Sequence, residues 1–399
     1  MSTEGAHAHA SQTRFVIMLG TIVALAPLSL SIHIQSIPAI AVELDTSYPA
    51  AQMTVSLFLF TVAAAQFLVG PLSDRLGRRP VLFGGLAIFA AAGWVAAVAP
   101  SIEVLLAARI IQAMGGCAAL VTPRAVVQDR YRGADAGRIM AYVAILQSCA
   151  PIMAPVIGGA IETVVGWRGI FAFLGVYAVA IGAVAVLRLP ESRPLDGGKV
   201  AGWTAIFRRY AVLLASRRYI AYTAVFAFGT TGYFGFLATG PAVMISELGL
   251  EPWQFSAMLT TISIQFVVGG YAASRIVMRF GVDPIILVGA GVQLISVAVF
   301  WVVSQHPDPV LVTATFCLYA LSNGLVFSTS LAGATSIDPR VAGSAASFLG
   351  AMQFLVGGAI ALTLAELPTA NFGALPLVLT ILAVGAFIAA LEVRRTRGL

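Results

Sequence analysis

The chain has 399 residues, of which 59% are hydrophobic and only 10% are charged. Soluble domains carry roughly 25% charged residues, and the deficit runs along the whole chain, which excludes a soluble protein with one membrane anchor. The formal charge of +6 does not indicate nucleic-acid binding, because the basic residues stand at the ends of apolar runs and form no continuous stripe.

The apolar runs are long enough for membrane-spanning helices, which need about 20 residues each. The run from Phe15 is interpreted as the first span and not as a signal-peptide core, because no small-x-small cleavage site follows before Glu43. We predict an all-α polytopic membrane protein with twelve spans, at 15–38, 50–72, 80–99, 103–126, 138–161, 168–188, 219–246, 253–274, 284–304, 309–332, 342–365 and 372–393.

The longest hydrophilic stretch lies in the middle of the chain and divides the spans into two six-helix bundles. The predicted organisation comprises an N-terminal segment 1–14, a bundle 15–188, a middle loop 189–218, a second bundle 219–393 and a C-terminal segment 394–399.

Basic residues predict the orientation, since Lys and Arg collect in cytoplasmic loops. With both termini in the cytoplasm, 21 of the 23 Lys and Arg fall on the cytoplasmic side, including Arg124 and Arg130, which flank the fourth loop. The exceptions are Arg168, placed at the outer end of the sixth span, and Arg109, within a span. The sequence therefore predicts a multi-pass protein whose termini and middle loop are cytoplasmic.

A compact motif of small, acidic and basic residues separates the second and third spans. Glycines permit a tight turn there, and the carboxylate can accept charge-assisted hydrogen bonds. Arginines that only fix the topology would require neither the acid nor the glycines. The motif residues are Gly70, Asp74, Arg75, Gly77 and Arg78, followed by Arg79. The loop at 274–284 repeats the pattern weakly in the second half.

This motif resembles the loop signature of the major facilitator superfamily. The resemblance implies two parallel six-helix repeats with a substrate site between them. It also implies that Asp74 meets the N-terminus of the eleventh helix when the transporter faces outward, where a carboxylate is favourable.

The fifth span contains two prolines and two glycines, which permit helix bending and close helix approach in a membrane. They are Pro151, Pro155, Gly158 and Gly159. The segment is similar to the antiporter signature of drug/proton exchangers, with Ala154 where that signature usually has glycine. Residues 167–168 and 343–353 add a resemblance to Bcr/CflA-type multidrug exporters of the bacterial inner membrane. The alternative for the prolines and glycines of the fifth span is an incidental packing interface between helices.

Arg109, followed by Gln112, matches the fourth-helix signature of the superfamily. An intramembrane charge is costly unless it faces a cavity and finds a partner, so Arg109 is a candidate for substrate binding or coupling. The alternative is an arginine that extends to the outer surface, six residues from Glu103.

The first span departs from the pattern of the Bcr/CflA-type exporters that the chain resembles, since these usually have an acidic residue there. Ser31 stands in its place, between Pro27 and Pro38, and no Asp or Glu falls in the middle of a predicted span. The nearest titratable group is His33, and a histidine with its usual pKa of about 6.5 suits a proton switch. The alternatives are a neutral histidine that lines a cavity and a histidine at the lipid interface. Because the sequence offers no acidic partner for Arg109 within the spans, it also suggests an anionic or carboxylate-bearing substrate.

Other polar and aromatic side chains complete the predicted substrate or coupling site. The further candidates are Gln35, Tyr233, Phe236, Gln265 and Gln353. The aromatic pair would stack on a drug, because small-molecule pockets are mostly apolar with few polar groups. Simple helix packing is the alternative for these aromatics.

The predicted function is export of small amphiphilic molecules by alternating access, coupled to proton entry. The alternative is an uptake or facilitative carrier for a small anionic metabolite. No nucleotide-binding loop is present, and no carboxylate pair or catalytic cluster lies at membrane depth. We therefore expect neither an enzyme nor a cofactor or metal. The expected partners are a small-molecule substrate, protons and lipid, with no nucleic acid, and the chain is expected to be monomeric.

Overall fold

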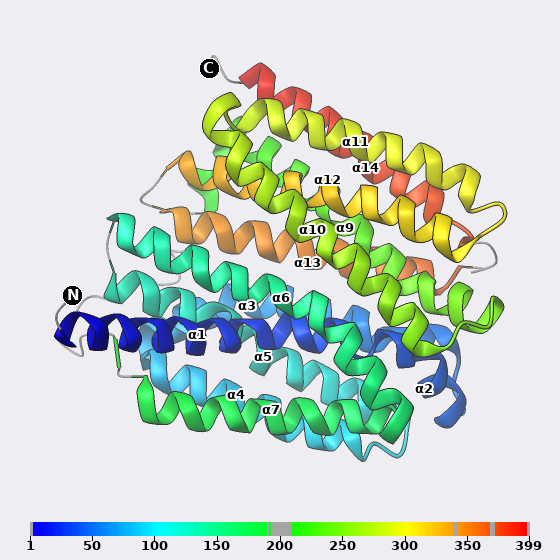
Figure 1. The fold of residues 1–399 in the computed structure, drawn as a ribbon, viewed down its shortest axis with the longest axis horizontal. Helices are drawn as coiled ribbons and strands as arrows, with labels where there is room; N and C mark the ends of the chain where they lie inside the picture. The colour runs from blue at the N-terminus through cyan, green and yellow to red at the C-terminus, as the bar shows by residue number, and fades with distance from the viewer. Residues whose placement is uncertain are drawn as a thin grey trace. The chain divides into compact units, whose positions relative to one another are not determined.

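We describe the protein from a computed structural model, which describes residues 3–131, 133–189, 191–192, 210–338, 341–367 and 372–396. In these ranges the chain forms helices joined by short connections, and they contain no strand (Figure 1). Most of the predicted middle loop, at 190 and 193–209, and the end of the predicted C-terminal segment lie outside the described residues.

The twelve predicted spans are confirmed as helices, since twelve segments of the described chain are long and apolar enough to cross a membrane. The first half contains α1 (Thr3–Ser31), η1 (Ile34–Ser36), α2 (Ile37–Glu43), α3 (Tyr48–Leu76), α4 (Arg78–Ala97), α5 (Ile102–Arg130), α6 (Gly133–Val165) and α7 (Trp167–Arg188). The second half contains α9 (Arg217–Pro241), η2 (Ala242–Glu247), α10 (Pro252–Phe280), α11 (Val282–Val303), α12 (Pro309–Ser336), α13 (Ala342–Ala365) and α14 (Leu375–Arg395).

Two spans are interrupted near one end. The first passes from α1 through the 3₁₀ turn η1 into α2, where Pro38 lies in the first turn of the new helix. The seventh passes from α9 into the π-helical segment η2 directly after Pro241. A proline lacks the N–H of a regular helix, so each break releases backbone carbonyl groups for other partners.

Several helices exceed the thickness of a bilayer. At 1.5 Å per residue, α5 with its 29 residues is about 44 Å long, against a hydrocarbon core of about 30 Å. Arg124 accordingly lies inside α5 and not beyond its end, and its Nη2 donates to Gln147 Oε1 of α6 at 2.9 Å.

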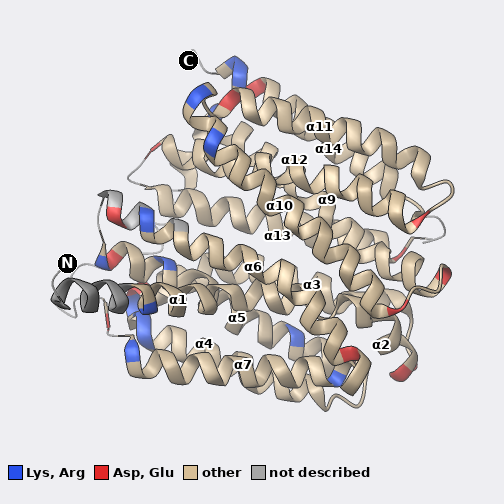
Figure 2. Ribbon diagram, in the orientation of Figure 1, with Lys and Arg blue, Asp and Glu red and all other residues tan. Residues whose placement is uncertain are grey.

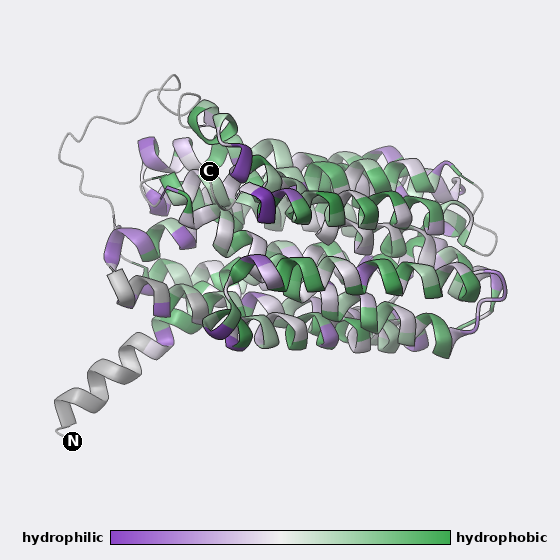
Figure 3. Ribbon diagram, turned by 90° about the horizontal axis from the view of Figure 1, so that it is seen from above, coloured by the Kyte–Doolittle hydropathy of each residue, from purple (hydrophilic) through white to green (hydrophobic). Residues whose placement is uncertain are grey.

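The chain divides into two compact units. Unit 1 comprises residues 1–33 and 64–200, and unit 2 comprises residues 34–63 and 201–399. Helix α3 therefore begins in unit 2 and ends in unit 1. Within each unit Lys and Arg gather mostly at one end of the helices (Figure 2), while hydrophobic residues dominate between the ends (Figure 3).

In unit 1, α4 packs against α5 and α7, and α1 packs against α5 and α6. The α4–α5 approach is close, because a Cβ atom at Gly115 would collide with the backbone carbonyl of Gly85. Small residues allow such approach between membrane helices, where packing replaces the hydrophobic effect. Unit 1 thus holds the middle of α5 closely against α4.

In unit 2, α9 packs against α12, α13 and α14, and α12 also packs against α10 and α11. Its core is aromatic: the ring of Phe236 stacks on that of Phe316, with centroids 4.0 Å apart. The ring of Phe300 meets Phe316 edge to face at 5.0 Å. Aromatic pairs of this kind stabilise a core beyond the area that they bury.

Candidate functional site

The polar core of unit 1 is built around Arg109, whose side chain is fully buried. Its Nη1 donates to Gln112 Oε1 at 2.7 Å and to Ser29 Oγ at 2.9 Å. Its Nη2 donates to the backbone carbonyl of Ser29 at 3.3 Å. The predicted pair Arg109 and Gln112 is therefore brought together one turn apart on α5, with α1 as the facing helix.

The position of Ser29 explains why a cation is tolerated there. Helix α1 ends at Ser31, and the last four carbonyl groups of a helix have no partner within it. These carbonyls carry the negative end of the helix dipole, which favours a positive charge. The end of α1 thus supplies negative potential close to Ser31, the position at which the sequence resemblance led us to expect an acid.

Phe171 of α7 connects Arg109 with His33. The guanidinium carbon of Arg109 lies 5.6 Å from the centroid of the Phe171 ring. The imidazole of His33 lies 5.4 Å from the same ring, centroid to centroid. Trp167 meets Phe171 edge to face at 6.0 Å and closes the cluster. His33, like Arg109, is fully buried, so both groups share one desolvated aromatic neighbour.

The other predicted substrate or coupling residues lie apart from this cluster. Ser31 is buried at the end of α1, while Gln35 is buried in η1 and belongs to unit 2. Phe236 is enclosed in the aromatic core of unit 2. Tyr233 is half-buried on α9. Gln265 and Gln353 are half-buried on α10 and α13, so their roles, like those of the whole set, stay predictions.

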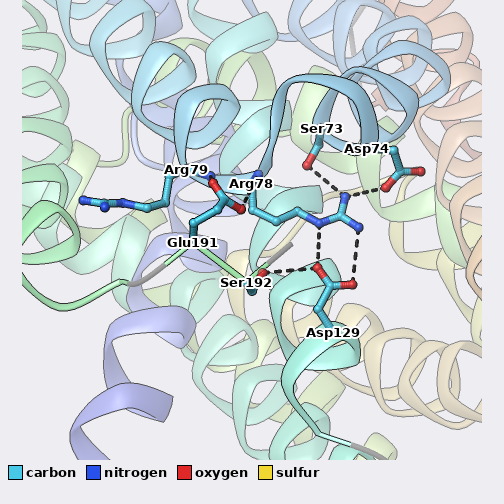
Figure 4. A network of polar contacts seen from close by, with 7 residues as sticks. All are labelled: Ser73, Asp74, Arg78, Arg79, Asp129, Glu191 and Ser192. Carbon is cyan, nitrogen blue, oxygen red and sulfur yellow. Dashed lines mark hydrogen bonds and ion pairs between the residues drawn. The ribbon is translucent and has the colours of Figure 1, made fainter. Parts of the chain in front are cut away.

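A second polar cluster surrounds Arg78 at the start of α4 (Figure 4). Its Nε donates to Asp129 Oδ2 of α5 at 2.8 Å, and its Nη2 reaches Asp129 Oδ1 at 3.4 Å. Its Nη1 pairs with Asp74 Oδ1 at 2.6 Å and donates to Ser73 Oγ at 3.0 Å. One guanidinium therefore ties the end of α3 to the start of α4 and the end of α5.

Glu191, just beyond α7, caps the N-terminus of α4. The backbone N–H groups of Arg78 and Arg79 donate to its two carboxylate oxygens, each at 3.0 Å. The turn before them requires Gly77, whose φ of +95° lies in the left-handed region. A carboxylate at a helix N-terminus bonds the free N–H groups and meets the positive end of the dipole.

The remaining motif residues occupy helices. Gly70 lies within α3, and Arg75 lies exposed in its last turn. Helix α6 continues without a break through both of its prolines, and it packs against α1. Pro155, Gly158 and Gly159 are buried, whereas Pro151 is half-buried.

Unit 2 has its own polar cluster near the repeated loop. Asp283 of α11 accepts from the Tyr222 hydroxyl at 2.7 Å and from Arg218 Nη2 at 3.1 Å. Gly281, with φ of +80°, lies two residues before Asp283, whereas Gly77 immediately precedes Arg78. The weak repeat thus holds in the turn, while an acid in unit 2 takes the central position that an arginine has in unit 1.

Sequence reasoning missed several side chains of these clusters, among them four partners of the two buried arginines and of the α4 cap. Asp129 and Glu191 are acids beside basic residues at the ends of spans, which was a usable signal. Ser29 acts partly through its carbonyl, and Phe171 is one of 23 phenylalanines. Neither stands out in a sequence, because only the end of α1 and the packing of α7 bring them to Arg109.

Twelve spans, two compact units and a buried intramembrane cation characterise a secondary transporter. Residues 19–362 match the sequence profile of the Major Facilitator Superfamily, and the chain therefore belongs to this superfamily. The predicted membership is confirmed.

The chain is 31% identical to the chloramphenicol resistance protein of Pseudomonas aeruginosa, over 72% of this chain and 68% of that protein. It is 29% identical to multidrug resistance protein D of Escherichia coli K12, over 92% of each. A bicyclomycin resistance protein homolog of Haemophilus influenzae is 24% identical over 86% of each. These names agree with the predicted resemblance to Bcr/CflA-type exporters.

The fold also matches solved transporters. A bacterial homolog of the human lysosomal transporter Spinster, in an inward-facing and unoccupied conformation, superposes with a TM-score of 0.73. The match covers 96% of this chain and 98% of that chain at 15% identity. At this identity the likeness shows the fold alone.

Substituting Gly77 by alanine is expected to destabilise the protein by about 1–3 kcal/mol, the usual cost of a non-glycine residue in a strained conformation. The added Cβ would also lie 3.0 Å from Glu191 Oε2 and disturb the cap. Thermal unfolding in detergent measures the effect. Gly70→Ala is the control, because a Cβ there meets nothing within 4 Å. Equal melting temperatures for both variants would contradict the role of the turn.

Asp129→Ala is expected to lower the free energy of unfolding by about 2 kcal/mol, because hydrogen bonds to charged groups contribute about 1.5–3 kcal/mol. The control is Asp135→Ala, whose pair with Arg138 at 3.3 Å is formed by side chains 68% and 52% exposed. Exposed pairs contribute little, so this variant should unfold like the wild type. A stable Asp129→Ala protein would show that Arg78 does not depend on this contact.

Proposed function

We propose that the protein exports small amphiphilic molecules by alternating access and exchanges them for protons. Membership of the superfamily and the drug-resistance names of its relatives support export of drugs. The observation that carries the coupling proposal is the buried arrangement of His33, Phe171 and Arg109 in unit 1. In this arrangement the titratable imidazole of His33 and the guanidinium cation of Arg109 both lie against the ring of Phe171.

His33 is the proposed proton carrier. A protonated imidazole would add a second positive charge near Arg109, since both groups lie against the ring of Phe171. Like charges in a desolvated site repel strongly. Proton binding would therefore weaken the hold of Arg109 on the end of α1. This supplies a physical link between protonation and the contact of α1 with α5.

Arg109 is the proposed organiser of the site, and it also supports the second candidate function. A fully buried guanidinium offers several N–H donors in a planar fork, which suits a carboxylate. A carrier for a small anionic metabolite would use this property directly. Drug export remains the first choice because several relatives are named as resistance proteins.

We further infer that both termini and the middle loop are cytoplasmic in a bacterial inner membrane, with one bundle on each side of that loop. The distribution of 21 of the 23 Lys and Arg supports this orientation. We infer a monomer, since a single chain carries both sets of six spans. We also infer transport without catalysis, as expected of the superfamily.

Arg109→Ala is expected to abolish transport, with at least a hundredfold loss, because it removes the charge that binds Ser29 and Gln112. Arg109→Lys keeps the charge and should retain part of the activity. Chloramphenicol flux into proteoliposomes measures both. Arg138→Ala, which changes a half-exposed surface arginine, is the control and should be fully active. Full activity in Arg109→Ala would exclude the proposed role.

His33→Ala is expected to lose the acceleration of chloramphenicol flux by an imposed pH gradient, while flux down the drug gradient persists. The physical reason is that alanine cannot bind the exchanged proton. His306→Ala is the matched control, because His306 is exposed in an outer connector. Wild-type flux that ignores the gradient would refute proton coupling. A normal gradient response in His33→Ala would move the proton carrier elsewhere.

A further inference from the structure

Helix α3 carries a row of polar residues in its first half. Tyr48, Gln52 and Ser56 are spaced four residues apart. Residues at this spacing lie above one another on one face of a helix. All three belong to unit 2. The row therefore forms one polar face in the first half of a largely apolar membrane span.

Tyr48 fixes one end of this face against α9. The N–H of Ala242 bonds to the carbonyl of Thr239 where α9 passes into η2. The carbonyl of Ala238 accepts from the Tyr48 hydroxyl at 2.7 Å. The break after Pro241 thus provides an acceptor, and the tyrosine uses it. Gln52 and Ser56, one and two turns further along α3, lie on the same face of the helix as Tyr48.

Gln52 and Ser56 are fully buried but lack hydrogen-bond partners. Within the described ranges neither amide atom of Gln52 is bonded, and the same holds for the hydroxyl oxygen of Ser56. Gln52 is also the one described side chain with two such atoms. By contrast, Gln293 of α11 is equally buried, but its Nε2 donates to the Gly229 carbonyl at 2.6 Å, and only its Oε1 has no described partner.

Buried polar groups in folded proteins are nearly always bonded, so two adjacent exceptions on one helix face call for an explanation, and a ligand that binds there in turn supplies one. We propose that Gln52 and Ser56 form a subsite that binds a neutral, hydrogen-bonding group of the transported molecule. This inference rests on the proposed transport function and extends it to the chemistry of the substrate.

The chemistry of the pair selects the ligand class. An amide offers two donors and an acceptor, and a hydroxyl offers one donor and two lone pairs. A hydroxyl or amide group of the ligand satisfies both kinds of site. A carboxylate would leave the Gln52 oxygen facing a negative charge, and an ammonium group would leave its nitrogen facing a positive one. The subsite therefore favours uncharged polar groups.

Tyr233 stands at a similar level to Gln52. At 1.5 Å per residue, Gln52 lies about 6 Å from Tyr48 along α3, and Tyr233 about 7.5 Å from Ala238 along α9. Both distances run from the same hydrogen bond toward the middle of the helix. A ligand that bonds to Gln52 would thus have an aromatic ring of unit 2 at its own depth.

The test uses the full chain in proteoliposomes, with chloramphenicol as the probe, because it is uncharged and carries two hydroxyl groups and an amide. Gln52→Met keeps the length of the side chain and removes its hydrogen bonds. Its KM for chloramphenicol should rise about tenfold. Its melting temperature should stay or increase, because replacing an unbonded buried polar group by an apolar one is neutral or stabilising. Ser56→Ala should raise KM about threefold.

Gln293→Met is the matched control and should show the opposite pattern, with a lower melting temperature and an unchanged KM. An unchanged KM in both Gln52→Met and Ser56→Ala would overturn the inference. So would a melting temperature of Gln52→Met as low as that of Gln293→Met, since Gln52 would then be structural. If the wild type does not transport chloramphenicol, the proposed drug export fails, and the subsite falls with it.

Discussion

A guanidinium within a membrane span can stay charged only where oxygen atoms surround it. Arg109 meets this constraint because α1 stops at Ser31 and leaves the carbonyl of Ser29 to accept from it. Gln112 adds an amide from α5, and Phe171 covers the group from α7. Three helices of unit 1 therefore depend on one side chain. The negative end of α1 supplies potential that favours the cation although the described bonds of Arg109 include no carboxylate.

Arg78 likewise contacts several helices, because its guanidinium joins the ends of α3 and α5 to the start of α4. The two clusters differ in their partners. Arg78 has two carboxylates, one of them half-exposed, whereas the described bonds of Arg109 are to neutral oxygens. Solvent and ions therefore weaken the ion pairs of Arg78, whereas the hydrogen bonds of the fully buried Arg109 are not screened. A network near water is therefore suited to breaking and reforming, and the buried one responds mainly to a change of local charge.

The spans could be predicted from sequence because about 20 apolar residues are needed to cross a bilayer, and each span is therefore visible as an apolar run of that length. Arg109 and Arg78 could also be predicted, since charges and glycines stand out in such a chain. The partners could not. The acceptor role of Ser29 depends on where α1 ends, and that of Phe171 on the packing of α7. Gln52 was overlooked because its significance is a lack of partners among the described residues.

The cap formed by Glu191 also defines where the N-terminal six spans are complete. Its carboxylate lies three residues beyond the end of α7 and binds the first turn of α4. A fragment that stopped at Arg188 would contain every span of that bundle yet leave two N–H groups of α4 without this partner. Separate expression of the two halves, or insertion of a reporter domain between them, should therefore keep the chain intact through Ser192.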